Sequence, residues 1–402
     1  MERHFQDERF EFARLGLLGA AYRGLSDVGE VLVTVDRIPD GDREAWVREF
    51  TALAERLERQ AHASAAGGLR VSARSAFLRA STYFDEASAC APGTSRPERF
   101  RALWLRHRDC WDRAAALFDP PVEPVLIPYE GTSLEGYLFR PPGGGGTRRP
   151  TLILNNGSDG PVTSMWKDGG AAAVERGWNA LTFDGPGQGA ALHRQGLPFR
   201  ADWERVVTPV VDWLLTRADV DPRRIALQGI SQAGYWVPRA VAFEHRVAAA
   251  VADPGVMRVG DSWREHLPPE LRQLLDAGEK ETFDASMAEG LKHAPAARAE
   301  LQWRMAPYGT RSPFDAYRAA EAMHLDAETL ARIDCPVLIT SPDHEQFWPG
   351  QSEELHAALK DSTLLRFTES EGASWHCEPA AAALRDERVF DWLERTLHTA
   401  RA

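Results

Sequence analysis

The first part of the chain shows the spacing of apolar positions that is typical of helices. Apolar side chains recur every three or four residues, as at Trp46, Phe50, Leu53 and Leu57. The strict alternation of apolar and polar residues that marks a half-buried strand is not found there. The pattern predicts an N-terminal, all-helical domain over residues 1–120.

The pattern changes after residue 120, where short apolar runs begin to alternate with helical stretches. Residues 125–129 and 134–139 alternate and predict two antiparallel strands. Continuous apolar runs then follow at residues 151–154, 180–183, 225–228, 247–251, 336–340 and 363–367. Buried strands that alternate with helices indicate a mostly parallel sheet covered on both faces. We therefore expect an α/β fold with a mostly parallel eight-stranded sheet over residues 121–402.

One long interval between the last strands breaks this alternation. Residues 257–330 contain helical stretches and no strand pattern. The interval follows the sixth strand, so it begins at the carboxyl edge of the sheet, where open α/β sheets bind ligands. We expect a helical lid insertion that lies over this edge.

Composition and charge exclude several classes of protein. The chain has 402 residues, 44% hydrophobic and 26% charged, as is usual for globular proteins. A net charge of −12 argues against nucleic-acid binding. No run reaches the roughly 18 apolar residues of a membrane span, and the charged start of the chain does not resemble a signal peptide. The four scattered cysteines favour neither disulfides nor a metal site and predict a cytoplasmic protein.

The strongest chemical signal is the segment that follows the strand at residues 225–228. It reads Gly-Ile-Ser-Gln-Ala-Gly over residues 229–234 and leads into a helix-compatible stretch. Small residues at Gly229 and Ala233, on either side of Ser231, are typical of a nucleophile elbow, because bulk there would clash in the tight strand-to-helix turn. A serine in a tight turn with no catalytic role has the same local pattern. Whether Ser231 is a nucleophile therefore depends on whether other loops supply a base, an acid and an oxyanion hole.

A nucleophilic serine needs a base and an orienting acid, and candidates for both follow later strands. His376 lies between the last strand and the last helix, where the chain order serine, acid, histidine places the base. The alternative is a histidine that only caps the last helix. Three carboxylates are candidates for the acid: Glu345, Asp343 and Asp253.

The oxyanion hole requires two hydrogen-bond donors near the serine. The backbone N–H of Gln232, directly after the serine, is one candidate. The other comes from the loop over residues 155–160, where we favour the N–H of Ser158 and keep Gly157 as the alternative. The Asn- and Gly-rich composition of this loop would also suit a plain turn.

The order of these motifs resembles the α/β-hydrolase family. The resemblance also rests on Asp-Gly-Pro-Gly-Gln-Gly at residues 184–189, whose spacing does not fit a dinucleotide fingerprint. In that family the acid is commonly the fifth residue past its strand, which selects Glu345 over its rival Asp343. Two departures are Glu345, where many relatives have Asp, and Asn155-Asn156, where His-Gly is common.

Further segments are similar to the α/β-hydrolase subfamily with an N-terminal helical cap domain. This subfamily includes 2,6-dihydroxypseudooxynicotine hydrolase and the fungal heptaketide-shortening hydrolases. The similar segments are residues 76–84, 155–157, 252–256 and 347–351.

The resemblance implies a serine hydrolase that cleaves a carbon–carbon bond beside a carbonyl of an aromatic or polyketide-like ketone. It implies no metal and no organic cofactor. The alternatives are a carboxylesterase, lactonase or amidase, a biosynthetic enzyme that forms or transfers bonds, and an idle ligand-binding protein. We expect a small-molecule substrate and no nucleic-acid or membrane partner; the subfamily also suggests a homodimer.

Several residues are candidates for the substrate pocket beneath the cap and the lid. An aromatic wall would suit a planar substrate, although such residues also fill cores. Arg79 could pair with a phenolate or carboxylate of the substrate, or form a structural ion pair. The candidate aromatic residues are Tyr235, Trp236, Trp166, Tyr83 and Trp263.

Overall fold

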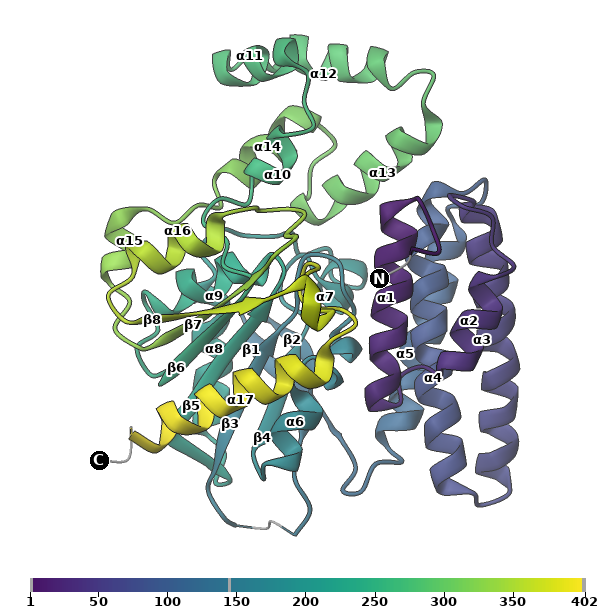
Figure 1. Ribbon diagram of the computed structural model, residues 1–402, viewed down its shortest axis with the longest axis vertical. Helices are drawn as coiled ribbons and strands as arrows, with labels where there is room; N and C mark the ends of the chain where they lie inside the picture. The colour runs from purple at the N-terminus through teal and green to yellow at the C-terminus, as the bar shows by residue number, and fades with distance from the viewer. Residues whose placement is uncertain (1–2, 144–145, 400–402) are drawn as a thin grey trace.

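A helical bundle stands beside a sheet, and a helical lobe rises above the sheet (Figure 1). The computed structural model describes residues 3–143 and 146–399. Asp7, Asp27 and Asp42 cap helices of the bundle by accepting hydrogen bonds from backbone N–H groups in the first turn. The bundle comprises α1 (Glu8–Ala20), α2 (Val28–Val35), α3 (Arg43–Ala66), α4 (Arg70–Cys90) and α5 (Arg99–Ala115).

The sheet has eight strands in the order β1-β2-β4-β3-β5-β6-β7-β8. β2 is antiparallel to both of its neighbours, and the strands from β4 to β8 pair in parallel. The predicted fold class is therefore confirmed. The strands are β1 (Glu123–Tyr129), β2 (Thr132–Phe139), β3 (Arg149–Asn155), β4 (Asn179–Phe183), β5 (Val220–Ile230), β6 (Ala249–Asp253), β7 (Val337–Pro342) and β8 (Ser362–Phe367).

The strand before the acid loop is longer than its apolar run indicates. β7 continues past Thr340 because Ser341 and Pro342 still pair with β8. Glu345 is therefore the third residue after the strand, not the fifth. Pairing with a neighbouring strand, which the apolar pattern does not show, decides where β7 ends.

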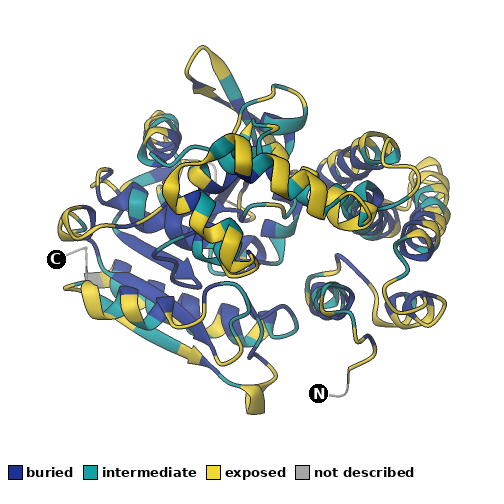
Figure 2. Cartoon of the chain, turned by 90° about the horizontal axis from the view of Figure 1, so that it is seen from above, coloured by how far each residue is buried: buried dark blue, intermediate teal, exposed yellow. Residues whose placement is uncertain are grey.

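Helices cover both faces of the sheet because successive strand residues point to opposite faces. On β3, Leu152 and Leu154 belong to one core cluster and Ile153 to the other. The first cluster includes residues of α6 (Gly170–Glu175) and α17 (Ala382–Thr399), and the second includes residues of α8 (Glu204–Leu215) and α9 (Ala233–Val241). Figure 2 shows the buried residues along the strands and on the inward sides of the helices.

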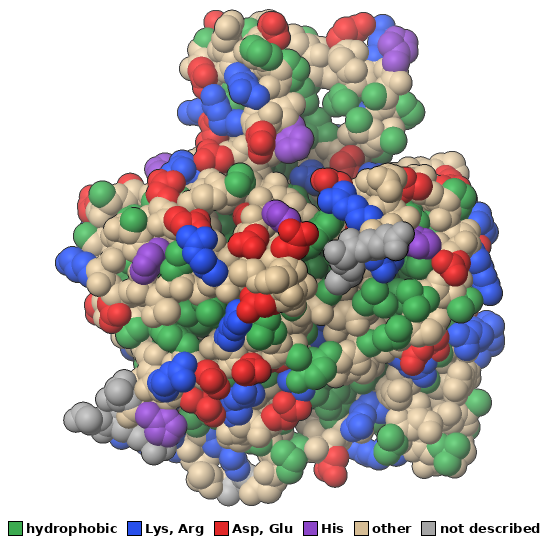
Figure 3. All heavy atoms as spheres, in the orientation of Figure 1, with side chains coloured by type: hydrophobic (Ala, Val, Ile, Leu, Met, Phe, Trp, Pro, Cys, Tyr) green, Lys and Arg blue, Asp and Glu red, His purple; other side chains and the backbone are tan. Residues whose placement is uncertain are grey.

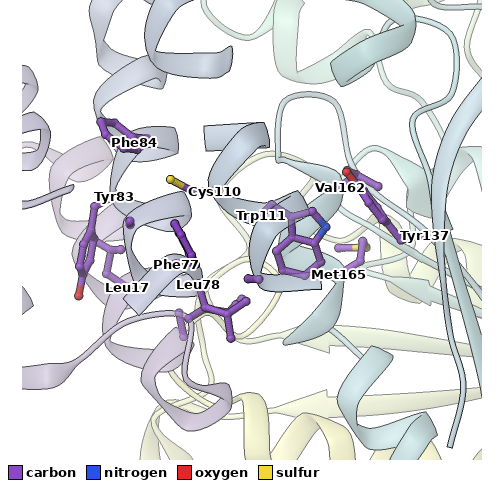
Figure 4. Packing of buried hydrophobic residues seen from close by; sticks show 14 of the residues in the cluster. Leu17, Phe77, Leu78, Tyr83, Phe84, Cys110, Trp111, Tyr137, Val162 and Met165 are labelled. Carbon is purple, nitrogen blue, oxygen red and sulfur yellow. The ribbon is translucent and has the colours of Figure 1, made fainter. Parts of the chain in front are cut away.

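The bundle and the sheet share one hydrophobic core. Trp111 of α5 is fully buried and meets Tyr137 and Phe139 of β2, with ring centroids 5.7 and 6.3 Å apart. Figure 4 shows Trp111 between residues of the bundle and residues of the sheet unit. A buried ion pair joins the same two parts, with Arg108 Nη1 at 2.6 Å from Asp184 Oδ2. The bundle is thus packed against the sheet through apolar contacts and a buried ion pair.

The lobe above the sheet is the insertion between β6 and β7. It has a small core of its own, formed by Leu267, Leu275, Phe283 and Tyr317. Figure 3 shows it as a projecting lobe, with acidic and basic side chains interspersed over the visible face of the molecule. Its helices are α10 (Asp261–Arg264), α11 (Pro269–Ala277), α12 (Lys280–Gly290), α13 (Pro295–Met305), α14 (Pro313–Glu321) and α15 (Ala327–Ala331).

The lobe is tied to the bundle by charged groups. Glu300 of α13 accepts from Arg9 of α1 at 2.5 Å and from Arg43 of α3 at 2.9 Å. The lobe therefore spans from the sheet edge to the bundle. No helix among the described residues has both the length and the apolar character needed to cross a membrane.

Candidate active site

The candidate residues meet because parallel strands end at the same edge of the sheet. Ser231 follows β5, Asp253 ends β6, and Glu345 follows β7. His376 lies in the segment between β8 and α17, and the loop after β3 begins at Asn156. Segments far apart in the sequence thus converge beneath the helical lobe and beside the bundle.

Ser231 occupies a tight turn between β5 and α9. Its φ of +56° lies in the left-handed region that a residue with a side chain rarely adopts. The turn leaves no room for bulk, because a Cβ on Gly229 would lie 2.7 Å from the Cβ of Ala233. The Ser231 N–H donates to the carbonyl of Asp253 at 2.6 Å, which ties the turn to β6.

His376 connects the serine with a carboxylate. Its Nε2 lies 2.9 Å from Ser231 Oγ. Its Nδ1 lies 2.9 and 2.8 Å from the two carboxylate oxygens of Glu345. With the proton on Nδ1, held by Glu345, Nε2 is free to accept the serine proton. This arrangement can support nucleophilic attack by Ser231.

Glu345 is well suited to remain ionised although it is largely buried. Burial acts to raise its pKa, but the neighbouring His376 and hydrogen bonds from the N–H groups of Phe347 and Trp348 outweigh burial and hold the pKa below its usual value. Rings of Phe347 and Trp348 also pack against the imidazole, with centroids 4.7 and 5.8 Å away. Glu345 therefore offers a fixed negative charge to Nδ1.

The two other candidate acids lie elsewhere. Asp343 is exposed, and its Oδ2 accepts from the N–H of Glu369 at 3.0 Å. Asp253 is fully buried, and its Oδ1 accepts from Thr340 Oγ1 at 2.7 Å. Neither carboxylate has a hydrogen bond to His376 in the described part of the chain.

The loop after β3 lies against the serine. A Cβ on Gly157 would lie 2.7 Å from the Cβ of Ser231. The Gly157 N–H is already occupied, because it donates to Asn156 Oδ1 at 2.7 Å. The N–H groups of Gln232 and Ser158 have no hydrogen-bond partner in the part of the chain that the structure describes. They are therefore available to an oxyanion.

The glycine-rich segment after β4 holds this loop in place. Gln188 Nε2 donates to the carbonyls of Asn156 and Gly157 at 2.7 and 2.6 Å. Its Oε1 accepts from the N–H of Gly185 at 2.9 Å. Gln188 of the motif at residues 184–189 thus fixes the backbone of the loop after β3, a role that the glycine spacing of the motif does not indicate.

The candidate pocket residues mostly lie in packed interiors. Tyr235 is buried and donates to the carbonyl of Ala201, and Trp236 stacks on Trp203 with centroids 4.1 Å apart. Trp166 stacks on Phe139 at 5.1 Å, close to the junction of bundle and sheet. These positions favour packing over contact with a ligand.

The remaining three candidates also have structural partners. Tyr83 is buried inside the bundle, where its hydroxyl donates to Glu30 at 3.2 Å. Arg79 forms an ion pair with the same Glu30 at 2.5 Å, within the bundle. Trp263 meets Tyr308 and Tyr317 edge-to-face inside the lobe. A role for any of them in binding substrate stays a prediction.

Two acidic residues on α4 face the loop after β3 and were not identified from the sequence. Burial and the nearby Asp159 raise the pKa of Asp85 to about 7. Burial and Asp85 raise the pKa of Glu86 to about 8, against the effect of Arg9 and Lys167. An Asp-Glu pair in a helix usually faces water, so only the tertiary structure shows that these two groups are half-buried near the site.

Helix α1 supports the segment that carries His376. The Phe12 ring lies 6.3 Å from the His376 ring. One face of α1 touches the backbone a few residues further along, because a Cβ on Gly19 would overlap the carbonyl oxygen of Pro379. The sequence predicted helices in this part of the chain, but not that one of them packs on the segment with the histidine.

We predict that Gly19→Ala destabilises the protein and weakens the candidate site. The added methyl group must displace the Pro379 backbone, and overpacking of this kind typically costs about 1–3 kcal/mol. Gly16→Ala on the same helix is the matched control, since nothing lies within 4 Å of its added Cβ. That change should stabilise the fold by about 1 kcal/mol, because alanine is the better helix former. Urea unfolding of both variants measures the two effects. Equal free energies of unfolding for Gly19→Ala and Gly16→Ala would contradict the close approach of Gly19 to Pro379.

Comparisons with known proteins agree with this architecture. No protein-family model matches the chain. Hydrolase ORFZ of Pyricularia oryzae is 31% identical over 98% of both chains. The alpha/beta hydrolase xenA of Xenoacremonium sinensis is also 31% identical, over 88% of this chain and 85% of its own. The crystal structure of 2,6-dihydroxy-pseudo-oxynicotine hydrolase superposes with a TM-score of 0.73 at 21% identity, covering 96% of this chain and 95% of that one.

Proposed function

The chain belongs to the α/β-hydrolase family, and from this premise we propose that it is a serine hydrolase whose triad is Ser231, His376 and Glu345. The observation that carries the proposal is the pair of contacts made by one imidazole. Its Nε2 lies 2.9 Å from the serine oxygen, and its Nδ1 lies 2.8 Å from the nearer carboxylate oxygen. This geometry is what a general base needs to activate a hydroxyl nucleophile.

In the proposed reaction, Ser231 Oγ attacks a substrate carbonyl while its proton moves to His376 Nε2. The negative charge that develops on the carbonyl oxygen is stabilised by the N–H groups of Gln232 and Ser158. Glu345 stays ionised and stabilises the imidazolium. Water then releases the acyl group from Ser231, with His376 as base.

We propose that the bond cleaved is a carbon–carbon bond beside the carbonyl of an aromatic or polyketide-like ketone. When that bond breaks, its electron pair stays on the leaving carbon, which takes the proton from His376. A phenolic or electron-poor ring stabilises this leaving group. The motifs shared with the helical-capped subfamily support this choice, and so does the bundle that packs beside the site.

Ester hydrolysis is the second candidate, because the same nucleophile, base and oxyanion donors act on an ester carbonyl. It differs only in the leaving group, an alcohol in place of a carbon. Nothing in the triad itself separates the two reactions. The choice therefore has to come from the products.

A matched substrate panel tests the proposal. Phenyl acetate and 2,4-dihydroxyacetophenone carry the same acetyl group on oxygen or on ring carbon. We expect mass spectrometry to detect resorcinol and acetate from the ketone, and neither product with Ser231→Ala. Turnover of the ester alone would favour the esterase. If intact protein turned over neither compound and an alkyl fluorophosphonate failed to label it, the serine-hydrolase proposal itself would fail.

A further inference from the structure

Two carboxyl groups lie next to each other beneath the candidate triad. Asp253 ends β6, and Glu378 follows His376 by two residues. Both are fully buried. The sequence analysis considered Asp253 only as a candidate triad acid, and the proposed mechanism uses neither group.

Too few donors serve this pair if both groups are ionised. Thr340 Oγ1 donates to Asp253 Oδ1 at 2.7 Å. The other three oxygens, Asp253 Oδ2 and both oxygens of Glu378, have no donor among the described residues. The adjacent Arg385 does not donate a hydrogen bond to any of these three oxygens. Its guanidinium donates to the carbonyl of Cys377 and to the carboxylate of Asp168 instead. Burying two ionised carboxylates with so few hydrogen bonds would strongly lower the stability of the fold.

A single shared proton removes this cost. If Glu378 is protonated, its O–H can donate to Asp253, and the two carboxyl groups lie within reach of such a hydrogen bond. Burial and the Asp253 charge raise the pKa of Glu378 well above its usual value. Burial raises the pKa of Asp253 as well, although Arg385 and Thr340 oppose that shift. Both shifts therefore favour a proton on the pair.

The pair joins the two segments that carry Ser231 and His376. The carbonyl of Asp253 accepts from the Ser231 N–H at 2.6 Å and from Cys377 Sγ at 3.4 Å. Cys377 and Glu378 have φ values of +57° and +45°, which persist only where surrounding contacts hold them. A hydrogen bond from the Glu378 side chain to the same Asp253 supplies such a contact.

We propose that Glu378 is a positioning residue for the proposed hydrolase, whose protonated carboxyl donates a hydrogen bond to Asp253 and so holds His376 against Ser231. The inference rests on the proposed function only for its effect on catalysis. The shared proton itself is a property of the fold and can be measured without activity.

The proton makes the fold sensitive to alkaline pH. Because the folded-state pKa of Glu378 lies above the unfolded value near 4.5, its stabilising contribution is complete below about pH 4.5 and is lost as the pH rises through the folded pKa. The charged and titratable groups that face the pair come from the surrounding loops and from α17. They are Asp168, Glu345, His376, Cys377 and Arg385.

Two substitutions of Glu378 separate the hydrogen bond from mere packing. Glu378→Gln keeps a neutral donor at every pH, whereas Glu378→Leu keeps the approximate volume and removes the donor. We expect an alkyl fluorophosphonate to label Ser231 in the Gln variant at a rate close to that of the wild type. The Leu variant should be labelled more slowly by about tenfold or more, since a small displacement of the base His376 lowers the reactivity of Ser231 to this extent. Equal loss in both variants would overturn the positioning role.

The pH dependence of unfolding tests the proton directly. As the pH rises from about 4.5 through the folded-state pKa of Glu378, the unfolding free energy of the wild type should fall more steeply than that of Glu378→Gln, by the equivalent of up to one bound proton. Equal slopes would overturn the shared proton. This comparison does not need the Leu variant to fold. It also remains decisive if the wild type is neither labelled nor active on the two substrates, an outcome that would reject the proposed function and not the shared proton.

Discussion

Replacing Ser231 with alanine is expected to remove essentially all hydrolytic activity and all labelling by fluorophosphonates. The serine oxygen is the atom that His376 Nε2 contacts at 2.9 Å, and alanine leaves the imidazole with no nucleophile to activate. Loss of the nucleophile in a comparable triad lowers kcat by about 10⁶-fold. Rates with phenyl acetate and gel-based labelling would measure the loss.

Ser164→Ala is the matched control for this experiment. Ser164 lies in a short helical turn over Val162–Trp166, and its hydroxyl donates to the carbonyl of Pro161. It has no contact with the triad among the described residues, so the variant should be labelled like the wild type. Labelling that survives in Ser231→Ala would show that another residue is the nucleophile.

Replacing Glu345 with glutamine is expected to produce the second largest loss. Glutamine keeps the size of the side chain but removes the negative charge from His376 Nδ1, and it can hold the imidazole in the wrong tautomer. A comparable change of the triad acid lowers kcat by about 10⁴-fold. Because the pKa of Glu345 is held below its usual value, the carboxylate stays ionised well into the acidic range. The acidic limb of the wild-type pH profile should therefore not follow the protonation of Glu345.

Asp343→Asn is the natural companion variant, since this acid lies two residues away in the same loop. Its carboxylate is exposed and accepts only from the N–H of Glu369 in the described structure. We expect the kcat and the pH profile of the Asp343→Asn variant to stay close to those of the wild type. A severe defect here, together with a mild one in Glu345→Gln, would assign the acid to Asp343.

The Asp253–Glu378 pair gives a reason for a buried acid in this position even when it is not the triad acid. Asp253 accepts hydrogen bonds from the elbow and from the segment with His376 through its backbone carbonyl. Its side chain then meets Glu378 from the same segment. One aspartate at the end of β6 thus connects both sides of the site.

Much of the fold was predictable because it depends on local patterns. Continuous apolar runs marked the strands of the parallel sheet, and helical spacing marked the bundle, since burial of one face requires these periods. The site segments could be found in the same way, because each follows a strand that is easy to recognise. Ser231 and His376 were chosen on that basis, and Glu345 by the resemblance to the α/β-hydrolase family. The structure brings their side chains within hydrogen-bond distance. Their catalytic roles remain predictions.

The pocket residues could not be chosen from the sequence with the same success. Trp236 and Tyr235 directly follow the elbow, but they lie on the side of α9 that packs on Trp203 and Ala201. An aromatic residue has the same sequence signal whether it lines a cavity or fills a core. Only the packing of one element on another separates the two cases.

By itself, the sequence determined the order of elements, the sheet class and the segments that meet at the carboxyl edge, because hydrophobic period and turn chemistry are local properties. The tertiary structure decided which carboxylate reaches His376, since Asp343 and Glu345 differ by only two residues but point to different neighbours. It also decided that Glu378 meets Asp253 with no cation hydrogen-bonded to either within the described structure. Contacts between residues distant in the chain depend on how elements pack in three dimensions, which no local pattern records.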